Sequence, residues 1–402
     1  MKLKIKKSTI LTVPYTALIV NVALGMVFKF VSSSILRKLF IASKILLLIS
    51  VILLNLIDIA QVSKFRFKVH MDSMLLALFV IYEIYISKVN GLLIFPDAYL
   101  DILIWPLMYL LFRNYTRKND IPPIFGKLVM TTMACVLLLS IPLIVKHRSG
   151  FGDVGGVIFY VYYCVTFLPM VLFTIKNDKT KNILFLLTIF VLVVSTKRSG
   201  TAVAVIGYVI YLFTNVRVRQ DIKNKFEKYW KYILVFSIAA LLVITLDQLF
   251  SFSIISRLKS IGADRGSGRE AIWIEVFEAF SRSPFDTKLF GHGYQAVYYR
   301  LKPYGVDRLA HNSFIEFLYD YGYIGLGVFL AFFATQIRSG LKAVRKKNPH
   351  APEMLYSLLV ALVFGMSSYF FEESAIIVPI AAFWGCFAGL NSRKTHIEAL
   401  RE

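Results

Sequence analysis

The chain has 402 residues, of which 57% are hydrophobic, and a formal net charge of +22. Soluble domains contain about 45–50% apolar residues, so this composition excludes an ordinary soluble protein and predicts membrane-spanning helices of about 20 residues each. The three cysteines, Cys135, Cys164 and Cys386, all fall in apolar runs and have neither disulfide nor metal-ligand spacing.

Apolar runs along the chain predict an all-α polytopic protein with about twelve transmembrane helices. They fall at roughly 9–30, 39–57, 72–87, 97–112, 124–145, 156–175, 183–197, 199–214, 232–250, 313–335, 354–371 and 375–391. Residues 1–250 then hold the first nine predicted spans. Residues 251–312 form one large extracytoplasmic loop, and residues 313–402 hold the last three spans and a cytoplasmic tail.

The positive charge is distributed by loop. With the N-terminus in the cytoplasm, more than half of the lysines and arginines fall in the cytoplasmic segments, which is the positive-inside pattern. The charge therefore indicates membrane topology, with both termini inside the cell, and argues against a nucleic-acid partner. The lysine cluster at the N-terminus precedes a long apolar run, which predicts an uncleaved first helix.

The large loop contains one segment with helical periodicity, between Ser267 and Pro284. Its apolar residues form one face, and Ser267 followed by Glu270 is a capping-box pattern. The apolar face is too short to span a membrane, so it is expected to pack on the membrane surface or on the helix bundle. A second capping pattern, Ser313 with Glu316, begins the following span and would place His311 just before a helix N-terminus.

Two arginines are candidates for binding an anion. Arg269 is predicted in the first turn of the loop helix, where free backbone N–H groups already favour a negative group. Arg198, in the sequence STKRSG, ends the seventh span on the same side of the membrane, and its guanidinium suits a pair of phosphate oxygens. The alternatives are an Arg269 side chain that reaches lipid headgroups and an Arg198 that anchors a short hairpin.

His311 is the candidate general base. The helix dipole disfavours the charged imidazole, which leaves a neutral ring able to accept a proton. The alternative is a histidine that only caps the helix. Further candidates for substrate binding are Arg265, Asn312, His292 and Lys197, although the glycines flanking His292 also indicate a tight turn. No metal constellation is visible in the sequence.

Taken in order, these motifs resemble a known superfamily. An arginine at the end of a mid-chain span, GRxxxW in a large outer loop, GHG, and HN followed by GxxGL are similar to bacterial O-antigen polymerases and O-antigen ligases. The resemblance is most specific from about Leu258 to Phe332. It implies a GT-C-like architecture in the bacterial cytoplasmic membrane, with the active site on the periplasmic face.

The resemblance also implies a chemistry. Members transfer a glycan from undecaprenyl pyrophosphate with inversion, without metal or cofactor, and a chain-length regulator is a further partner. By this likeness, Arg269 and Arg198 hold the pyrophosphate and His311 deprotonates the acceptor. The GSGR, GHG and HN set favours a polymerase over a ligase. A transporter or flippase for lipid-linked sugars and a structural scaffold remain alternatives from other classes.

Overall fold

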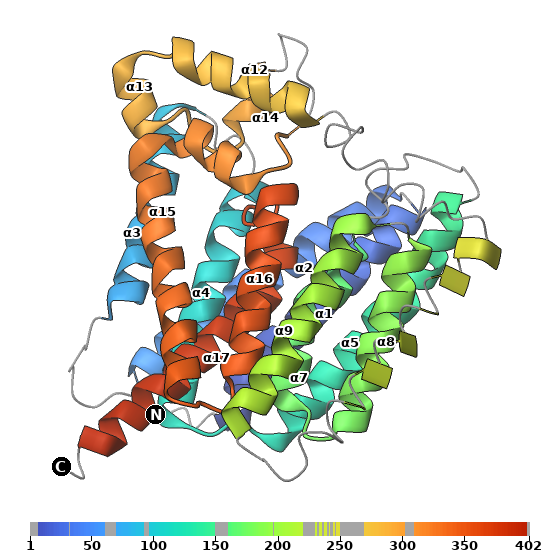
Figure 1. Ribbon diagram of the computed structural model, residues 1–402. Helices are drawn as coiled ribbons and strands as arrows, with labels where there is room; N and C mark the ends of the chain where they lie inside the picture. The colour runs from blue at the N-terminus through green and yellow to red at the C-terminus, as the bar shows by residue number, and fades with distance from the viewer. Residues whose placement is uncertain are drawn as a thin grey trace.

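The computed structural model describes residues 7–31, 33–60, 70–91, 96–148, 160–195, 197–219, 269–301 and 309–399, together with scattered residues from 230 to 249. These residues form helices and turns, with no strand among them (Figure 1). The helices are α1 (Lys7–Val31), α2 (Ser34–Ala60), α3 (Met71–Val89), α4 (Pro96–Lys118), α5 (Pro123–Arg148), α7 (Tyr162–Thr174), α8 (Asp178–Val194), α9 (Arg198–Arg219), α12 (Arg269–Arg282), α13 (Phe285–Phe290), α14 (Ala296–Leu301), α15 (Ser313–Arg345), α16 (Ala351–Ser367) and α17 (Ser374–Ala399).

The all-helical membrane class predicted from the sequence is confirmed. Each predicted span overlaps one of these helices, except 232–250, which falls mostly outside the described residues. Six of the described helices, α1, α2, α5, α9, α15 and α17, are long and apolar enough to cross a membrane. That is fewer than the dozen predicted. The helices α7 and α16 are apolar but shorter, and the remaining described helices do not combine the length and the hydropathy that a span needs. The GT-C-like architecture stays a prediction.

The apolar surface of the bundle fits a lipid environment. Along α2, Leu46, Leu53 and Leu56 are each more than half exposed, although the helix is strongly apolar. An apolar face of this length would be unfavourable in water and is expected where acyl chains cover it. Inside the bundle, α17 packs along α4, and α16 lies against both α9 and α15.

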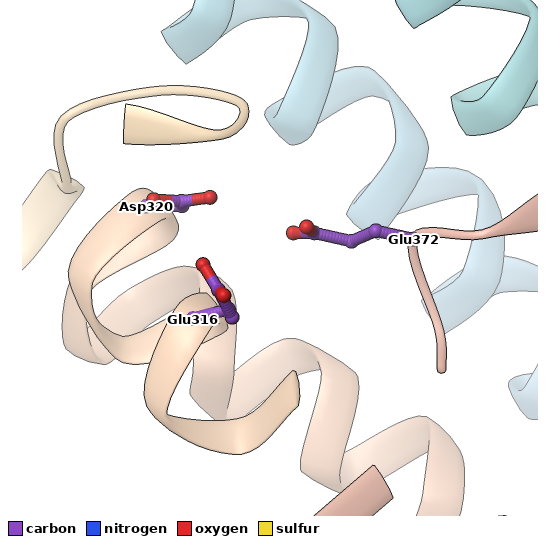
Figure 2. A group of neighbouring side chains, drawn as sticks. All are labelled: Glu316, Asp320 and Glu372. Atoms are coloured by element: carbon purple, nitrogen blue, oxygen red, sulfur yellow. The ribbon is translucent and has the colours of Figure 1, made fainter. Parts of the chain in front are cut away.

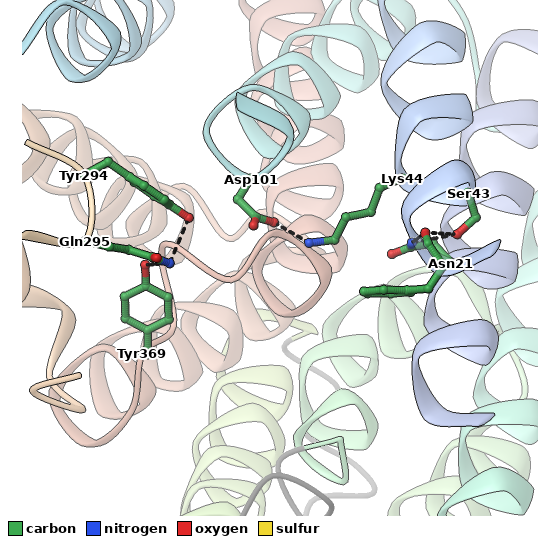
Figure 3. Close-up of polar contacts among 8 residues, drawn as sticks. Asn21, Ser43, Lys44, Asp101, Tyr294, Gln295 and Tyr369 are labelled. Atoms are coloured by element: carbon green, nitrogen blue, oxygen red, sulfur yellow. Dashed lines mark hydrogen bonds and ion pairs between the residues drawn. The ribbon is translucent and has the colours of Figure 1, made fainter. Parts of the chain in front are cut away.

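Several charged side chains inside the described part of the bundle form ion pairs. Lys44 on α2 forms an ion pair of 2.8 Å with Asp101 on α4, and both side chains are largely buried (Figure 3). Arg113 on α4 similarly contacts Asp72 on α3, at 3.0 Å. Charges in an apolar interior are costly unless paired, so these bonds fix the positions of α2, α3 and α4.

One end of the bundle carries the short helices α12, α13 and α14, and α15 begins at this same end (Figure 1). The predicted loop helix is confirmed as α12, with Val276 and Phe280 buried. They pack with Ile315 and Tyr319 of α15. The apolar face of the loop helix therefore packs on the bundle, which was one of the two expected outcomes.

The helix α15 is interrupted at Gly322, where the backbone has φ 64° and ψ −169°. The interruption leaves carbonyl groups without helical hydrogen-bond partners, and N–H groups of the GHG turn bind them. The N–H of His292 donates to the carbonyl of Tyr319 at 3.2 Å, and the N–H of Gly293 donates to that of Asp320 at 2.6 Å. The hydroxyl of Tyr82 on α3 donates to the carbonyl of Tyr321 at 3.1 Å. The GHG motif is thus a docking turn for the break in α15.

Replacing Gly322 with alanine is expected to destabilise the protein strongly. A Cβ atom there would lie 2.5 Å from the carbonyl oxygen of Leu289, and the backbone conformation is one that only glycine adopts readily. The backbone strain alone costs about 1–3 kcal/mol. Thermal unfolding of the purified variant in detergent should show a lowered Tm. Gly327→Ala is the matched control, since a Cβ at Gly327 meets nothing within 4 Å; an equal loss in both variants would contradict this explanation.

Candidate active site

His311 lies directly before the first turn of α15, as predicted. Its backbone has φ 51°, in the left-handed region that non-glycine residues rarely adopt. The helix cap is Asn312, whose side chain accepts hydrogen bonds from the N–H groups of Phe314 at 3.0 Å and Ile315 at 3.3 Å. Strained residues of this kind are held by the surrounding structure and are concentrated at functional sites.

The predicted capping box of Ser313 with Glu316 is wrong in its register. Because Asn312 is the cap, Glu316 lies one position too far along to complete the box. Its carboxylate instead accepts the backbone N–H of Ala310, and the N–H of His311 also approaches it. Glu316 therefore holds the segment before α15 that carries the candidate base. The error arose because Asn and Ser are adjacent and both are good caps.

Ser313 connects this segment to the turn at residues 368–373. Its hydroxyl donates to the carbonyl of Ser368 at 3.3 Å and accepts the N–H groups of Phe370 at 2.8 Å and Phe371 at 3.2 Å. The guanidinium of Arg269 donates to the carbonyl of Ser367, the residue before Ser368. Arg269 and the start of α15 therefore bind consecutive carbonyl groups at the end of α16.

A second contact joins α12 to the same segment before α15. The indole N–H of Trp273, one helical turn after Arg269, donates to the carbonyl of Ala310 at 2.7 Å. Ala310 directly precedes His311, so the first turn of α12 lies over the residues that lead into α15. The W of the GRxxxW motif thus positions the arginine-bearing helix against the candidate base.

The STKRSG hairpin reaches the same region from the other side of α16. Burial, together with the charge of Arg269, lowers the pKa of Lys197 to about 8. Its ammonium lies 5.6 Å from the ring centre of Tyr162, whose hydroxyl is 2.7 Å from the Ser199 hydroxyl. The structure therefore brings Lys197 and Arg269 together, although more than seventy residues separate them in sequence.

Arg198 is the first residue of α9, and its side chain lies outside the described part of the structure. The sequence placed it at the end of the preceding span, whereas α8 already ends at Val194. This correction matters for charge, because α9, α12 and α15 now all begin around the end of α16. Helix N-termini carry partial positive charge and free N–H groups, so the region is suited to bind an anion.

His292 lies inside the docking turn. Its ring stacks on Tyr319 with 4.3 Å between centroids, and its Nε2 is 3.0 Å from the Ser283 hydroxyl. Burial and the nearby Arg300 lower its pKa to about 4, so the ring is neutral at physiological pH. These contacts explain the position of His292 by packing within the turn. Its role in substrate binding stays a prediction. Arg265 lies outside the described residues.

A cluster of buried carboxylates lies beside the start of α15 and was not predicted from the sequence. Glu316, Asp320 and Glu372 point toward one another, and one oxygen of each lies within 4.8 Å of the others (Figure 2). Two negative charges at this separation repel by about 3–4 kcal/mol at an effective dielectric constant of ~20. The spacing of Glu316 and Asp320 in an apolar span was a visible signal, but Glu372 comes from a distant turn.

The family comparison covers the part of the chain that carries this geometry. Residues 183–330 match the Wzy_C family model, described as O-antigen ligase. The match includes the STKRSG hairpin, α12, the GHG turn and His311. No curated protein matches the chain. The match supports the resemblance noted in the sequence: residues 183–330 are similar to a Wzy_C domain, which is consistent with the O-antigen ligase superfamily.

Proposed function

We propose that the protein is a polysaccharide polymerase, a membrane glycosyltransferase that joins oligosaccharide repeats carried on undecaprenyl pyrophosphate. The family match supports O-antigen ligase- or polymerase-type activity in general. The observation that carries the proposal is that α12 contacts the segment leading into His311, while Arg269 binds the end of α16 and its charge lowers the pKa of Lys197. Cationic groups and helix N-termini on one side of a candidate base are the arrangement that transfer from a diphosphate requires.

In this mechanism, Arg269, Arg198 and the N-termini of α9 and α12 hold the donor diphosphate. His311 takes the proton from a hydroxyl of the acceptor sugar, whose oxygen forms the new glycosidic bond at the anomeric carbon. The bond from that carbon to the diphosphate breaks, and undecaprenyl pyrophosphate leaves with the electron pair. Attack opposite the leaving group inverts the anomeric centre. The positive groups offset the charge that develops on the diphosphate, so the reaction needs no metal ion or cofactor.

The arrangement of the chain supports an extracytoplasmic site. The helix α17 runs to the end of the bundle away from α12, α13 and α14 (Figure 1). The last turn and C-cap of α15 are also basic, with Lys342, Arg345 and Lys346. By the positive-inside rule, this charge supports a topology in which that end faces the cytoplasm of a bacterial inner membrane and His311 and Arg269 lie on the periplasmic side. Lipid-linked sugars on that side would reach the site by lateral diffusion within the membrane leaflet.

A ligase that transfers the glycan to lipid A–core is the second candidate, because the matched family model carries that description. Deleting the gene and separating the surface glycans on a gel distinguishes the two. A polymerase mutant should show cores that carry a single repeat. Bare cores, with polymer retained on the carrier lipid, would overturn the polymerase proposal in favour of the ligase, and an unchanged glycan ladder would overturn both.

A further inference from the structure

The carboxylates of Glu316, Asp320 and Glu372 have no part in the transfer reaction proposed above. Glu316 and Asp320 lie one turn apart on α15, and neither is exposed. Glu372 reaches them from the 368–373 turn and is only 3% exposed (Figure 2). Three acidic groups from two separate segments therefore converge in the interior of the protein.

Each carboxylate keeps unused oxygen atoms for the centre of the cluster. Glu316 uses Oε1 to accept the Ala310 N–H, and Asp320 uses Oδ1 to accept the Val297 N–H at 3.2 Å. Glu316 Oε2, Asp320 Oδ2 and both oxygens of Glu372 are buried without a hydrogen-bond partner. The Glu372 side chain is thus an unpartnered group, aimed from another segment at the pair on α15.

No protein cation balances this charge within the described part of the chain. The ion pairs of the described residues lie elsewhere: Lys44, for example, binds Asp101 at 2.8 Å. Buried carboxylates of this kind must bind either protons or a metal ion.

We propose that the three carboxylates bind one hard divalent cation, Ca²⁺ or Mg²⁺. All the free donors are oxygens, which are the ligands these ions prefer, and one oxygen from each of the three residues lies within 4.8 Å of the others. The ion would fasten α15 to the turn at 368–373. The same turn binds Ser313 and follows the carbonyl that holds Arg269, so the cation secures the geometry of the candidate site while the reaction itself uses no metal.

The test measures metal content and thermal stability, so it is independent of the transfer activity. Full-length protein is purified in detergent, stripped with EDTA and reloaded with CaCl₂, MgCl₂ or MnCl₂. After buffer exchange, mass spectrometry of the metals should find about one ion per chain, and Tm at pH 7.5 should rise by several degrees in a saturable way. Glu372→Gln and Asp320→Asn should lose both effects. Glu353→Gln, a buried glutamate of α16 outside the cluster, should keep them.

Three results would overturn the proposal. Wild-type protein that retains no ion and has the same Tm with and without the salts has no such site. An equal rise of Tm in Glu372→Gln and in wild type would place the bound ion elsewhere. If the salts have no effect while acidification stabilises wild type and Glu372→Gln exceeds it in Tm at pH 7.5, the cluster holds protons instead. Since wild type is tested directly, a variant that fails to fold does not prevent a decision.

Discussion

His311→Ala is expected to slow glycan elongation by about 10²–10⁴-fold, the range that general base catalysis contributes. The acceptor hydroxyl is a poor nucleophile unless a base removes its proton, and His311 is the histidine that lies at the helix start near Arg269. The measurement is the initial rate at which purified protein in liposomes lengthens a lipid-linked repeat. Binding of the donor should change little, because the diphosphate is held by other groups.

His350→Ala is the matched control for this prediction. His350 lies at the N-terminus of α16, whereas the candidate site lies around that helix's C-terminus, and its ring contacts Phe173. It should keep near wild-type activity at the same protein level. A His311→Ala protein that is folded, as judged by Tm, and still elongates glycans within tenfold of the wild-type rate would show that His311 is a capping residue without chemistry.

Arg269→Lys is expected to lower kcat/KM nearly as much as Arg269→Ala. A guanidinium can bind two phosphate oxygens at once and still donate to the carbonyl of Ser367, whereas an ammonium acts as a point charge. The loss of one preorganised group that stabilises developing charge typically costs about 10²–10³-fold in rate. Steady-state kinetics with a lipid-linked repeat as the donor provides the measurement.

Arg282→Ala serves as the control on the same helix. Arg282 ends α12 and forms an exposed ion pair of 2.9 Å with Glu278, so its removal should leave kcat/KM almost unchanged. If Arg269→Lys retained wild-type kinetics, the arginine would be a general surface cation or a headgroup contact. If both substitutions of Arg269 unfolded the protein, the contact with Ser367 would be the main role of the arginine. Rates are therefore compared only for variants that remain folded, as judged by Tm.

Local features of the site were predictable from the sequence. The loop helix followed from the spacing of its apolar residues, and α12 begins at Arg269 and ends shortly before Pro284. The position of His311 before a helix start followed from the polar residues that precede an apolar run. Such features depend on neighbours within a few residues, so the chain records them directly.

Long-range features were not predictable in the same way. The break at Gly322 depends on the GHG turn that fills it, some thirty residues earlier, and nothing local to α15 reveals the pairing. Glu372 joins Glu316 and Asp320 only because Ser313 fixes the turn at 368–373 against α15. The proximity of Lys197 to the charge of Arg269 likewise depends on how α9 and α16 pack.

The central claim is that Arg269, Arg198 and His311 surround one diphosphate. A cryo-EM structure of the purified protein with undecaprenyl pyrophosphate tests it most directly. The account predicts diphosphate density between the Arg269 guanidinium and the start of α9, with the Arg198 side chain directed at it and the His311 ring facing the position of the departing sugar. Diphosphate bound elsewhere, or an Arg198 side chain directed away from Arg269, would contradict it.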